Sequence, residues 1–292
     1  MILGEINSAI NLVERFKKYY RFFKNPTELE SVASRFIRLF ETHGVHRNQI
    51  PRFFGHGITL KDLQDDLSLL AKLDEELLDD ACKLFAVRRE WLDGAEKQAH
   101  PHHDFYKEPK EFLEFIKALK LANAEGDLDG ELFAPDALDS GAETILILNE
   151  IIGHVGNEPI YRYHLCNNWS YSYWKARAYL TACIAIAWKH HVFIRGTIAS
   201  NKSINKLAQG ETLLACLKRG VESLSGKKWY PEDMALIPEV FLQDVDPEYH
   251  NFGNISALDL WLELEKQGLM DTGIKKDARL LFMQERASYS PN

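Results

Sequence analysis

Cysteine is scarce in this chain of 292 residues, and the four cysteines, Cys82, Cys166, Cys183 and Cys216, lie far apart. Because no C-x-x-C pair occurs, the sequence indicates neither a zinc knuckle nor a redox pair. Cys82 and Cys183 lie within apolar helical patterns, which is typical of buried thiols in a reducing compartment. We therefore expect a cytoplasmic protein.

Long hydrophobic runs are absent as well. The most apolar stretch, from Ala178 to Trp188, has basic residues on both sides and about half of the roughly 20 residues that a membrane span needs. The N-terminus, Met1 to Glu5, has neither a basic region nor a continuous apolar region, so no signal peptide is indicated. We expect no membrane partner.

Several catalytic signatures are missing, namely the P-loop, G-x-G-x-x-G, G-x-S-x-G, H-E-x-x-H and the kinase motifs. Their absence disfavours an enzyme without excluding one. The net charge of −8 argues against a protein that coats nucleic acid non-specifically. Apolar residues make up 46% of the chain, which excludes disorder and indicates a folded globular protein.

Helical periodicity dominates the first 96 residues. The first expected helix carries an aromatic and aliphatic stripe with Lys17, Lys18 and Arg21 among the residues between. Amphipathic helices are expected from Ile6 to Phe23, from a cap at Thr27 to Gly44, from Thr59 to Ala71, and after Asp74.

The end of this helical region carries a distinctive motif, Leu77-Leu-Asp-Asp-Ala-Cys-Lys-Leu-Phe-Ala-Val87 followed by Arg88-Arg-Glu-Trp-Leu-Asp-Gly94. It resembles the end of a Cro/lambda-repressor-type helix-turn-helix domain, in which a helix ends in a leucine, small residue, valine turn and a short helix then ends in Trp-Leu and a glycine. The resemblance covers at most Glu28 to Glu96 and implies a DNA-binding transcriptional regulator of bacterial type. The residues expected to cover the bundle, or to permit its left-handed exit, are Val87, Trp91, Leu92 and Gly94.

Such a protein reads DNA with the second helix of its pair, and two placements of that helix remain open. The family's spacing selects Thr59 to Ala71, whose carboxylates would oppose phosphates. The other placement selects Val45 to Phe54, and residues 1–57 hold nine Lys and Arg against five Asp and Glu, whereas residues 58–95 hold five against ten. Charge therefore favours the second placement, although a bundle of this topology that binds another protein is an alternative. The candidate DNA-binding residues are Arg47, Asn48, Gln49 and Arg52.

Residues 97–109 form a polar break with two prolines and three histidines, and we expect a linker there. The spacing of His100, His102, His103 and Asp104 matches no standard metal site, so no metal or other cofactor is expected. Residues 126–141 read as an acidic, turn-rich loop.

The second half mixes helical and strand patterns. We therefore predict an α+β protein, with an all-helical, helix-turn-helix-like domain at 1–96, a linker at 97–109 and a mixed α/β domain with a small sheet at 110–292. Strands are expected at Thr144–Leu148, Tyr161–Leu165 and Val192–Ile198, and helices at Phe112–Leu121, Ser172–His190 and Ala257–Leu264 and from Ser203.

The stretch from Tyr161 to Arg177 combines rings, amides and cations at an expected strand-to-helix junction. A helix N-terminus attracts anions, and aromatic rings stack on planar ligands, so a nucleotide or another small anionic ligand is one hypothesis. The alternative is that the rings belong to the core and the cations pair with surface acids. The candidate ligand-binding residues are Arg162, His164, Trp169, Tyr173, Lys175 and Arg177.

Three functions remain open. The first is a transcriptional regulator with a C-terminal ligand-sensing or oligomerisation domain. The second is an adaptor that binds protein and not DNA, and the third is an enzyme of unrecognised type at the 162–177 junction, with no catalytic residue assigned. A homodimer is expected because two half-sites multiply affinity for DNA, and the expected helix from Ile6 to Phe23 is the candidate dimer element.

Overall fold

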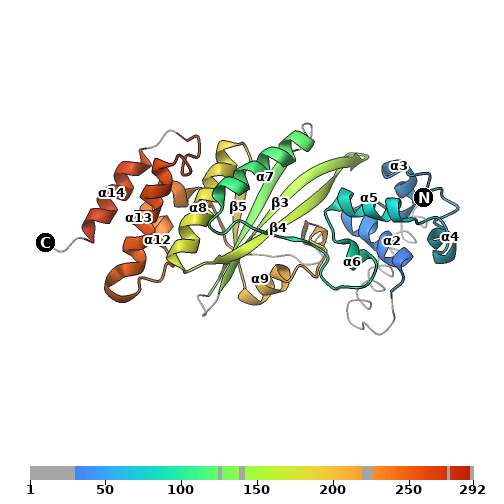
Figure 1. Cartoon of the computed structure of the whole chain (residues 1–292), viewed down its shortest axis with the longest axis horizontal. Helices are drawn as coiled ribbons and strands as arrows, with labels where there is room; N and C mark the ends of the chain where they lie inside the picture. The colour runs from blue at the N-terminus through green and yellow to red at the C-terminus, as the bar shows by residue number, and fades with distance from the viewer. Residues whose placement is uncertain (1–29, 124–126, 138–141, 219–225, 275–276, 290–292) are drawn as a thin grey trace, which may run out of the picture.

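The computed structural model describes residues 30–123, 127–137, 142–218, 226–274 and 277–289. It shows an α+β protein in which a helical region precedes a six-stranded mixed sheet and further helices (Figure 1). The predicted fold class is thus confirmed. The helix expected from Ile6 to Phe23 lies outside the described residues. No helix within the described ranges combines the length and the apolarity needed to cross a bilayer.

The helical region folds largely where the periodicity predicts. Its first described helix is capped by Ser31, whereas the expected cap, Thr27, lies outside the described residues, and the helix ends as predicted at Gly44 with a positive φ of 97°. The elements are α2 (Val32–His43), the 3₁₀ turn η1 (Arg47–Gln49), α3 (Ile50–Phe53), α4 (Asp66–Leu70), α5 (Glu75–Phe85) and α6 (Arg89–Leu92).

The closing motif is part of the core of the helical region. Val87, Trp91 and Leu92 are buried in the core of the helical region, and Gly94 has a φ of 84°. Ala86 ends α5 in the left-handed conformation as well.

The helix expected over residues 59–71 is shorter than predicted. The carboxylate of Asp62 accepts hydrogen bonds from the backbone N–H and the hydroxyl of Thr59, at 2.8 and 2.7 Å, which closes a turn. Asp65 then caps α4 by accepting from the backbone N–H of Ser68 at 2.8 Å. The helix therefore begins at Asp66, because the aspartates preceding it satisfy backbone donors outside a helix.

The sheet has the strand order β1-β4-β3-β2-β5-β6. Strand β2 occupies residues expected to form a loop, and it pairs antiparallel with β3 and parallel with β5. Gly130 in β2 serves close packing, because a Cβ there would lie 2.5 Å from Ile194 Cδ1. The strands are β1 (His102–Asp104), β2 (Leu128–Pro135), β3 (Glu143–Val155), β4 (Glu158–Ser170), β5 (Ile194–Ala199) and β6 (Lys228–Trp229).

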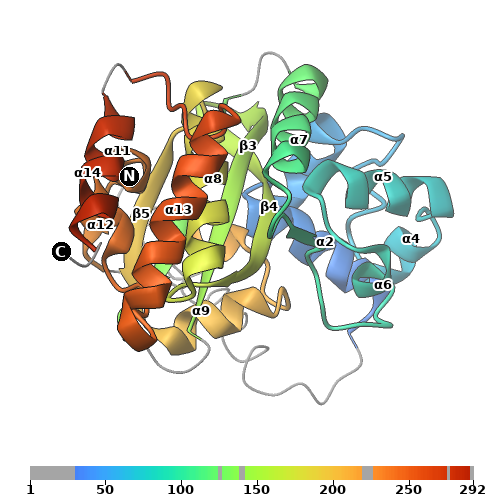
Figure 2. The same ribbon diagram turned by 60° about the vertical axis from the view of Figure 1, so that its left-hand side comes forward.

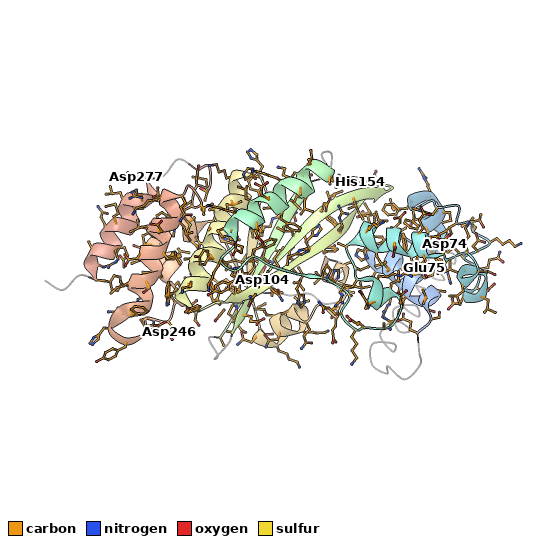
Figure 3. The ribbon with its side chains drawn as sticks, viewed as in Figure 1. Asp74, Glu75, Asp104, His154, Asp246 and Asp277 are labelled. Carbon is orange, nitrogen blue, oxygen red and sulfur yellow. The ribbon has the colours of Figure 1, made fainter. Side chains whose placement is uncertain are left out.

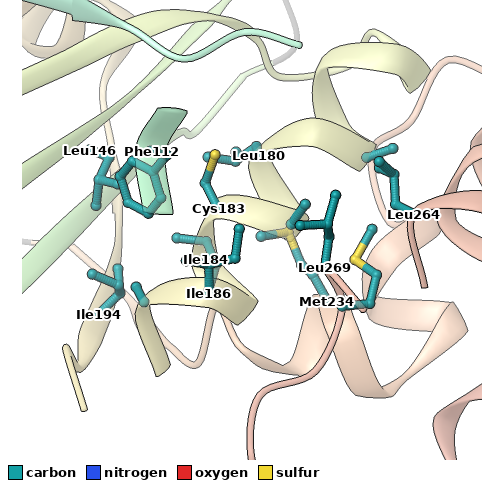
Figure 4. Close-up of a cluster of buried hydrophobic side chains, with 14 of the residues drawn as sticks. Phe112, Leu146, Leu180, Cys183, Ile184, Ile186, Ile194, Met234, Leu264 and Leu269 are labelled. Atoms are coloured by element: carbon teal, nitrogen blue, oxygen red, sulfur yellow. The ribbon is translucent and has the colours of Figure 1, made fainter. Parts of the chain in front are cut away.

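One face of the sheet is covered by α7, α8 and α13, and α9 lies on the other face (Figure 2). The main core fills the first layer, where Cys183 and Ile184 of α8 belong to one buried cluster with Leu146 of β3 and Leu264 of α13 (Figure 4). The remaining elements are α7 (Pro109–Ala122), α8 (Trp174–Lys189), α9 (Asn201–Ala208), α10 (Ala215–Lys218), α11 (Asp233–Leu236), α12 (Pro238–Leu242), the 3₁₀ turn η2 (Tyr249–Asn251), α13 (Phe252–Lys266) and α14 (Ala278–Ser288).

Residues 97–109 are not a free linker. They include β1, which pairs in parallel with β4, and the fully buried His100, whose Nε2 accepts a hydrogen bond from the backbone N–H of Leu214 at 3.1 Å. The core of the helical region also continues past this segment, because Ile160 of β4, Leu213 and Cys216 belong to it. The helices and the sheet thus share buried surface.

Candidate functional site

The four candidate DNA-binding residues lie on η1 and α3, but they do not form one open face. Arg47 is drawn toward α4, where its Nη2 lies 3.7 Å from Asp66 Oδ1. The Gln49 side chain turns back and accepts from the backbone N–H of His46 at 3.0 Å. Asn48 and Arg52 are exposed, four residues apart on one helical turn. The structure therefore leaves two of the four side chains free to meet a partner.

The segment from Thr59 to Ala71, which the family's spacing would select as the DNA-reading helix, carries exposed leucines and carboxylates. Leu67 is 80% exposed, Leu70 is 41% exposed and follows it on the same face of α4, and Leu60 in the preceding turn is 59% exposed. Residues 60–80 hold eight Asp and Glu against two Lys. We call Leu60, Leu67 and Leu70, with Asp62 and Asp65 beside them, the acidic leucine surface. Asp74 and Glu75 lie at the same end of the molecule (Figure 3).

The six candidate ligand-binding residues are dispersed over three places. Trp169 and Arg177 are buried, and Arg177 donates to the carbonyl oxygens of Tyr171 and Phe241. Tyr173 precedes α8, whereas Lys175 in its first turn stacks on Trp174 at 4.9 Å. Only Arg162 and His164 come together. These residues do not line one common pocket, because the strand and the helix turn their side chains into different layers.

Arg162 and His164 converge on Glu150, which faces Arg162 directly across the β3–β4 pair. Nε and Nη2 of Arg162 both donate to the Glu150 carboxylate, and His164 Nε2 lies 3.0 Å from Glu150 Oε2. Asn123 at the end of α7 donates to the same carboxylate at 3.2 Å. Burial alone would raise the pKa of Glu150, but the hydrogen bonds from His164 and Arg162 and the guanidinium charge outweigh it and lower the pKa to about 2.

Two histidines near this cluster are held neutral. Burial, followed by the charge on His43, lowers the pKa of His100 to about 3. Burial and then the charge on His164 lower the pKa of His103 to about 4. The Nε2 atom of His103 is buried and has no hydrogen-bond partner among the described residues. In the part of the chain that the structure describes, no group of three or more His, Cys, Asp or Glu side chains could hold a metal ion.

A thiol–imidazole pair at His164 and Cys166 is not supported. Cys166 is fully buried, and burial raises the pKa of its thiol well above the ordinary value. The imidazole Nε2 of His164 is engaged by Glu150. The thiol is therefore neither accessible nor activated.

An open pocket of about 350 Å³ lies where the helical region meets β4, and we call it the junction pocket. Three apolar side chains from the ends of α3 and α5 form one wall, and polar groups form the rim. Arg162 connects the pocket to Glu150, because it contacts both. Its Nη1 donates to the carbonyl oxygen of Lys83 at the pocket, at 3.2 Å, and its Nε donates to the Glu150 carboxylate. The lining residues are Phe53, Phe54 and Leu84 on the apolar wall, and His56, Asp80, Lys83 and Arg162 on the polar side.

Comparison with known proteins finds no matching protein-family model, no matching curated protein and no matching solved structure. The helix-turn-helix resemblance therefore rests on residues 77–94 and stays a prediction.

Sequence reasoning missed Glu150, Asp80, Lys83 and His56. One signal could have found Glu150, because it is a carboxylate two residues after Leu148, where the apolar run of an expected buried strand ends. The other three come from segments whose meeting with β4 depends on tertiary packing.

Proposed function

We propose that the protein is an interaction protein whose acidic leucine surface binds a basic amphipathic helix. The observation that carries this proposal is the exposure of Leu67 and Leu70 on one face of a short helix. Exposed apolar patches with a polar rim mark protein-binding surfaces. The surrounding carboxylates repel DNA phosphates and favour a cationic partner.

The partner that the chain itself offers is the segment from Ile6 to Phe23 of a second copy. This segment has an apolar stripe and holds four Lys and Arg against one Glu, which complements the acidic leucine surface. The first described residues lie beside this surface, since the hydroxyl of Ser31 donates to Asp66 of α4 at 2.9 Å. Two copies that exchange this segment form a symmetric homodimer in which each surface is covered.

Light scattering on the full chain tests the proposal. We expect the wild-type protein to be a dimer and Leu67→Asp to be a monomer, because a carboxylate would be buried against an apolar stripe. Phe16→Asp should have the same effect from the other side of the contact. The control is Leu121→Asp, since Leu121 is an exposed leucine on α7. A monomeric wild-type protein, or a dimer that withstands both substitutions, would contradict the proposal.

DNA binding is the second candidate, and the position of Asn48 and Arg52 favours it. Neither side chain makes a hydrogen bond or an ion pair within the described residues, and both project from η1 and α3 into solvent. Amide and guanidinium groups are the side chains that read base edges and bind phosphates. A dimer would then place two such pairs on neighbouring half-sites.

An electrophoretic shift assay with genomic DNA fragments tests this candidate. We expect Arg52→Ala to weaken binding and to reduce the slope of log affinity against log salt by about 0.9, since one phosphate contact is lost. Lys202→Ala on α9 is the control, because Lys202 is exposed on another part of the molecule. The absence of any salt-dependent shift in the wild-type protein would exclude DNA as a partner.

The proposed compartment is the cytoplasm. All four cysteines are free and buried, which fits a reducing environment.

A further inference from the structure

The apolar wall of the junction pocket is held in place by the core of the helical region. The ring of Phe54 packs at 5.1 Å from Phe40 and stacks on His56 at 4.1 Å. The ring of Phe53 packs closely against the backbone of the β3–β4 hairpin at Gly153, since a Cβ at that position would lie 3.0 Å from the ring. A volume of about 350 Å³ accommodates one large side chain or ring, so the pocket has room for an apolar side chain against this wall.

The polar side of the pocket offers an acceptor and donors next to each other. Asp80 Oδ1 and Lys83 Nζ lie 3.1 Å apart at the rim. The Arg162 guanidinium is fixed by Glu150 on one edge and by the Lys83 carbonyl on the other. Arginine has five N–H groups, and two bonds to Glu150 and one to the Lys83 carbonyl use three of them, so two remain for a ligand. The pocket therefore presents a carboxylate and two cationic groups beside an apolar wall.

The charges of the pocket balance. Lys83 and Arg162 are cations, and Asp80 with Glu150 behind Arg162 supplies two carboxylates. A simple anion or cation would leave one group opposed by a like charge, whereas a zwitterion satisfies both signs. We infer that the junction pocket binds a free α-amino acid with a large apolar or aromatic side chain. Its ammonium group meets Asp80, its carboxylate meets Lys83 and Arg162, and its side chain lies on Phe53, Phe54 and Leu84.

This ligand would touch α3, α5 and β4 together, and so would stabilise the contact between the helical region and the sheet. The inference goes beyond the proposed dimerisation, because none of the residues of the acidic leucine surface lines the pocket. A ligand that binds only the folded protein raises its thermal midpoint.

Isothermal titration and thermal unfolding of the full chain test the inference with four probes. L-phenylalanine and L-leucine are expected to bind and to raise the thermal midpoint. Phenethylamine lacks the carboxylate and N-acetyl-L-phenylalanine lacks the ammonium charge, so each should bind at least about tenfold more weakly, as expected for a lost charge-assisted hydrogen bond.

Variants assign the two ends of the ligand. Asp80→Asn and Lys83→Met should each weaken L-phenylalanine binding at least about tenfold, because each removes the partner of one ligand charge. Glu76→Gln on the same helix and Lys61→Met are exposed controls. Leu67→Asp should bind L-phenylalanine normally, which separates this inference from the dimer proposal. The inference is overturned if neither amino acid binds at about 10 mM, or if both analogues bind as tightly as L-phenylalanine.

Discussion

Replacing Glu150 with alanine is expected to lower the free energy of unfolding by about 3 kcal/mol or more. The carboxylate is buried and accepts hydrogen bonds from Arg162 and Asn123 and contacts His164. Its removal leaves the half-buried guanidinium group of Arg162 without its counter-charge, and this is costlier than the loss of an exposed pair. The amide of Asn123 would lose an acceptor as well.

Chemical denaturation at neutral pH measures the effect. Glu114→Ala is the matched control, since Glu114 forms an exposed pair with Lys117 on α7 and its loss should cost less than about 1 kcal/mol. Equal stability losses in the two variants would show that Glu150 does not organise the sheet. The contribution of Glu150 should also fade in acid, because the lowered pKa stabilises the fold above about pH 4.5 and this stability is lost as the pH falls toward 2.

His100 should lower the free energy of unfolding in acid as well, and at a higher pH than Glu150 does. The folded-state pKa is about 3, whereas an unfolded histidine titrates near 6.5, so below pH 6.5 the unfolded chain takes up a proton that the folded protein does not. The stability is therefore complete above this range and is lost as the pH falls from about 6.5 toward 3. At pH 5 the loss from this one site reaches about 2 kcal/mol. His103 adds a smaller loss in the same direction, because it is partly exposed.

The measurement is the free energy of unfolding between pH 7.5 and 4.5. His100→Gln should flatten this dependence, since its amide can still accept from the backbone N–H of Leu214 but does not titrate. His154→Gln is the control, because His154 lies exposed near the tip of the β3–β4 hairpin (Figure 3). A profile that is identical in the wild-type protein and in His100→Gln would assign the acid sensitivity to other groups.

The sequence predicts the elements whose burial is periodic and local. The helices α2 and α8 were expected close to their observed positions. The strands β3 and β4 were expected only over Thr144–Leu148 and Tyr161–Leu165, and each extends well beyond those bounds. Strand β2 was not expected, because residues 126–141, which include Gly130, have an acidic, turn-rich composition. The need for glycine there arises from Ile194 on a strand far along the chain, and no local pattern records that contact.

In the candidate sites, too, the sequence indicates single residues but not the tertiary contacts that bring them together. Arg162 and His164 attract attention as cations in an aromatic stretch, but their function as partners of Glu150 depends on the β3–β4 register, which contains two irregularities. Asp80 and Lys83 read as ordinary residues of a solvated helix face. They become part of a pocket only because α5 packs beside β4, and that contact is tertiary.

The shared core of the helices and the sheet has a consequence for modularity. A fragment that ended at Gly94 would keep all the described helices of the first region but would lose Ala99, Ile160, Leu213 and Cys216, which complete its interior. Its inner surface would be open to water on the side where the hairpin normally lies. The helical region is therefore not expected to fold as an independent domain. A chimeric protein that carries it must also supply a β-hairpin of matching length and shape.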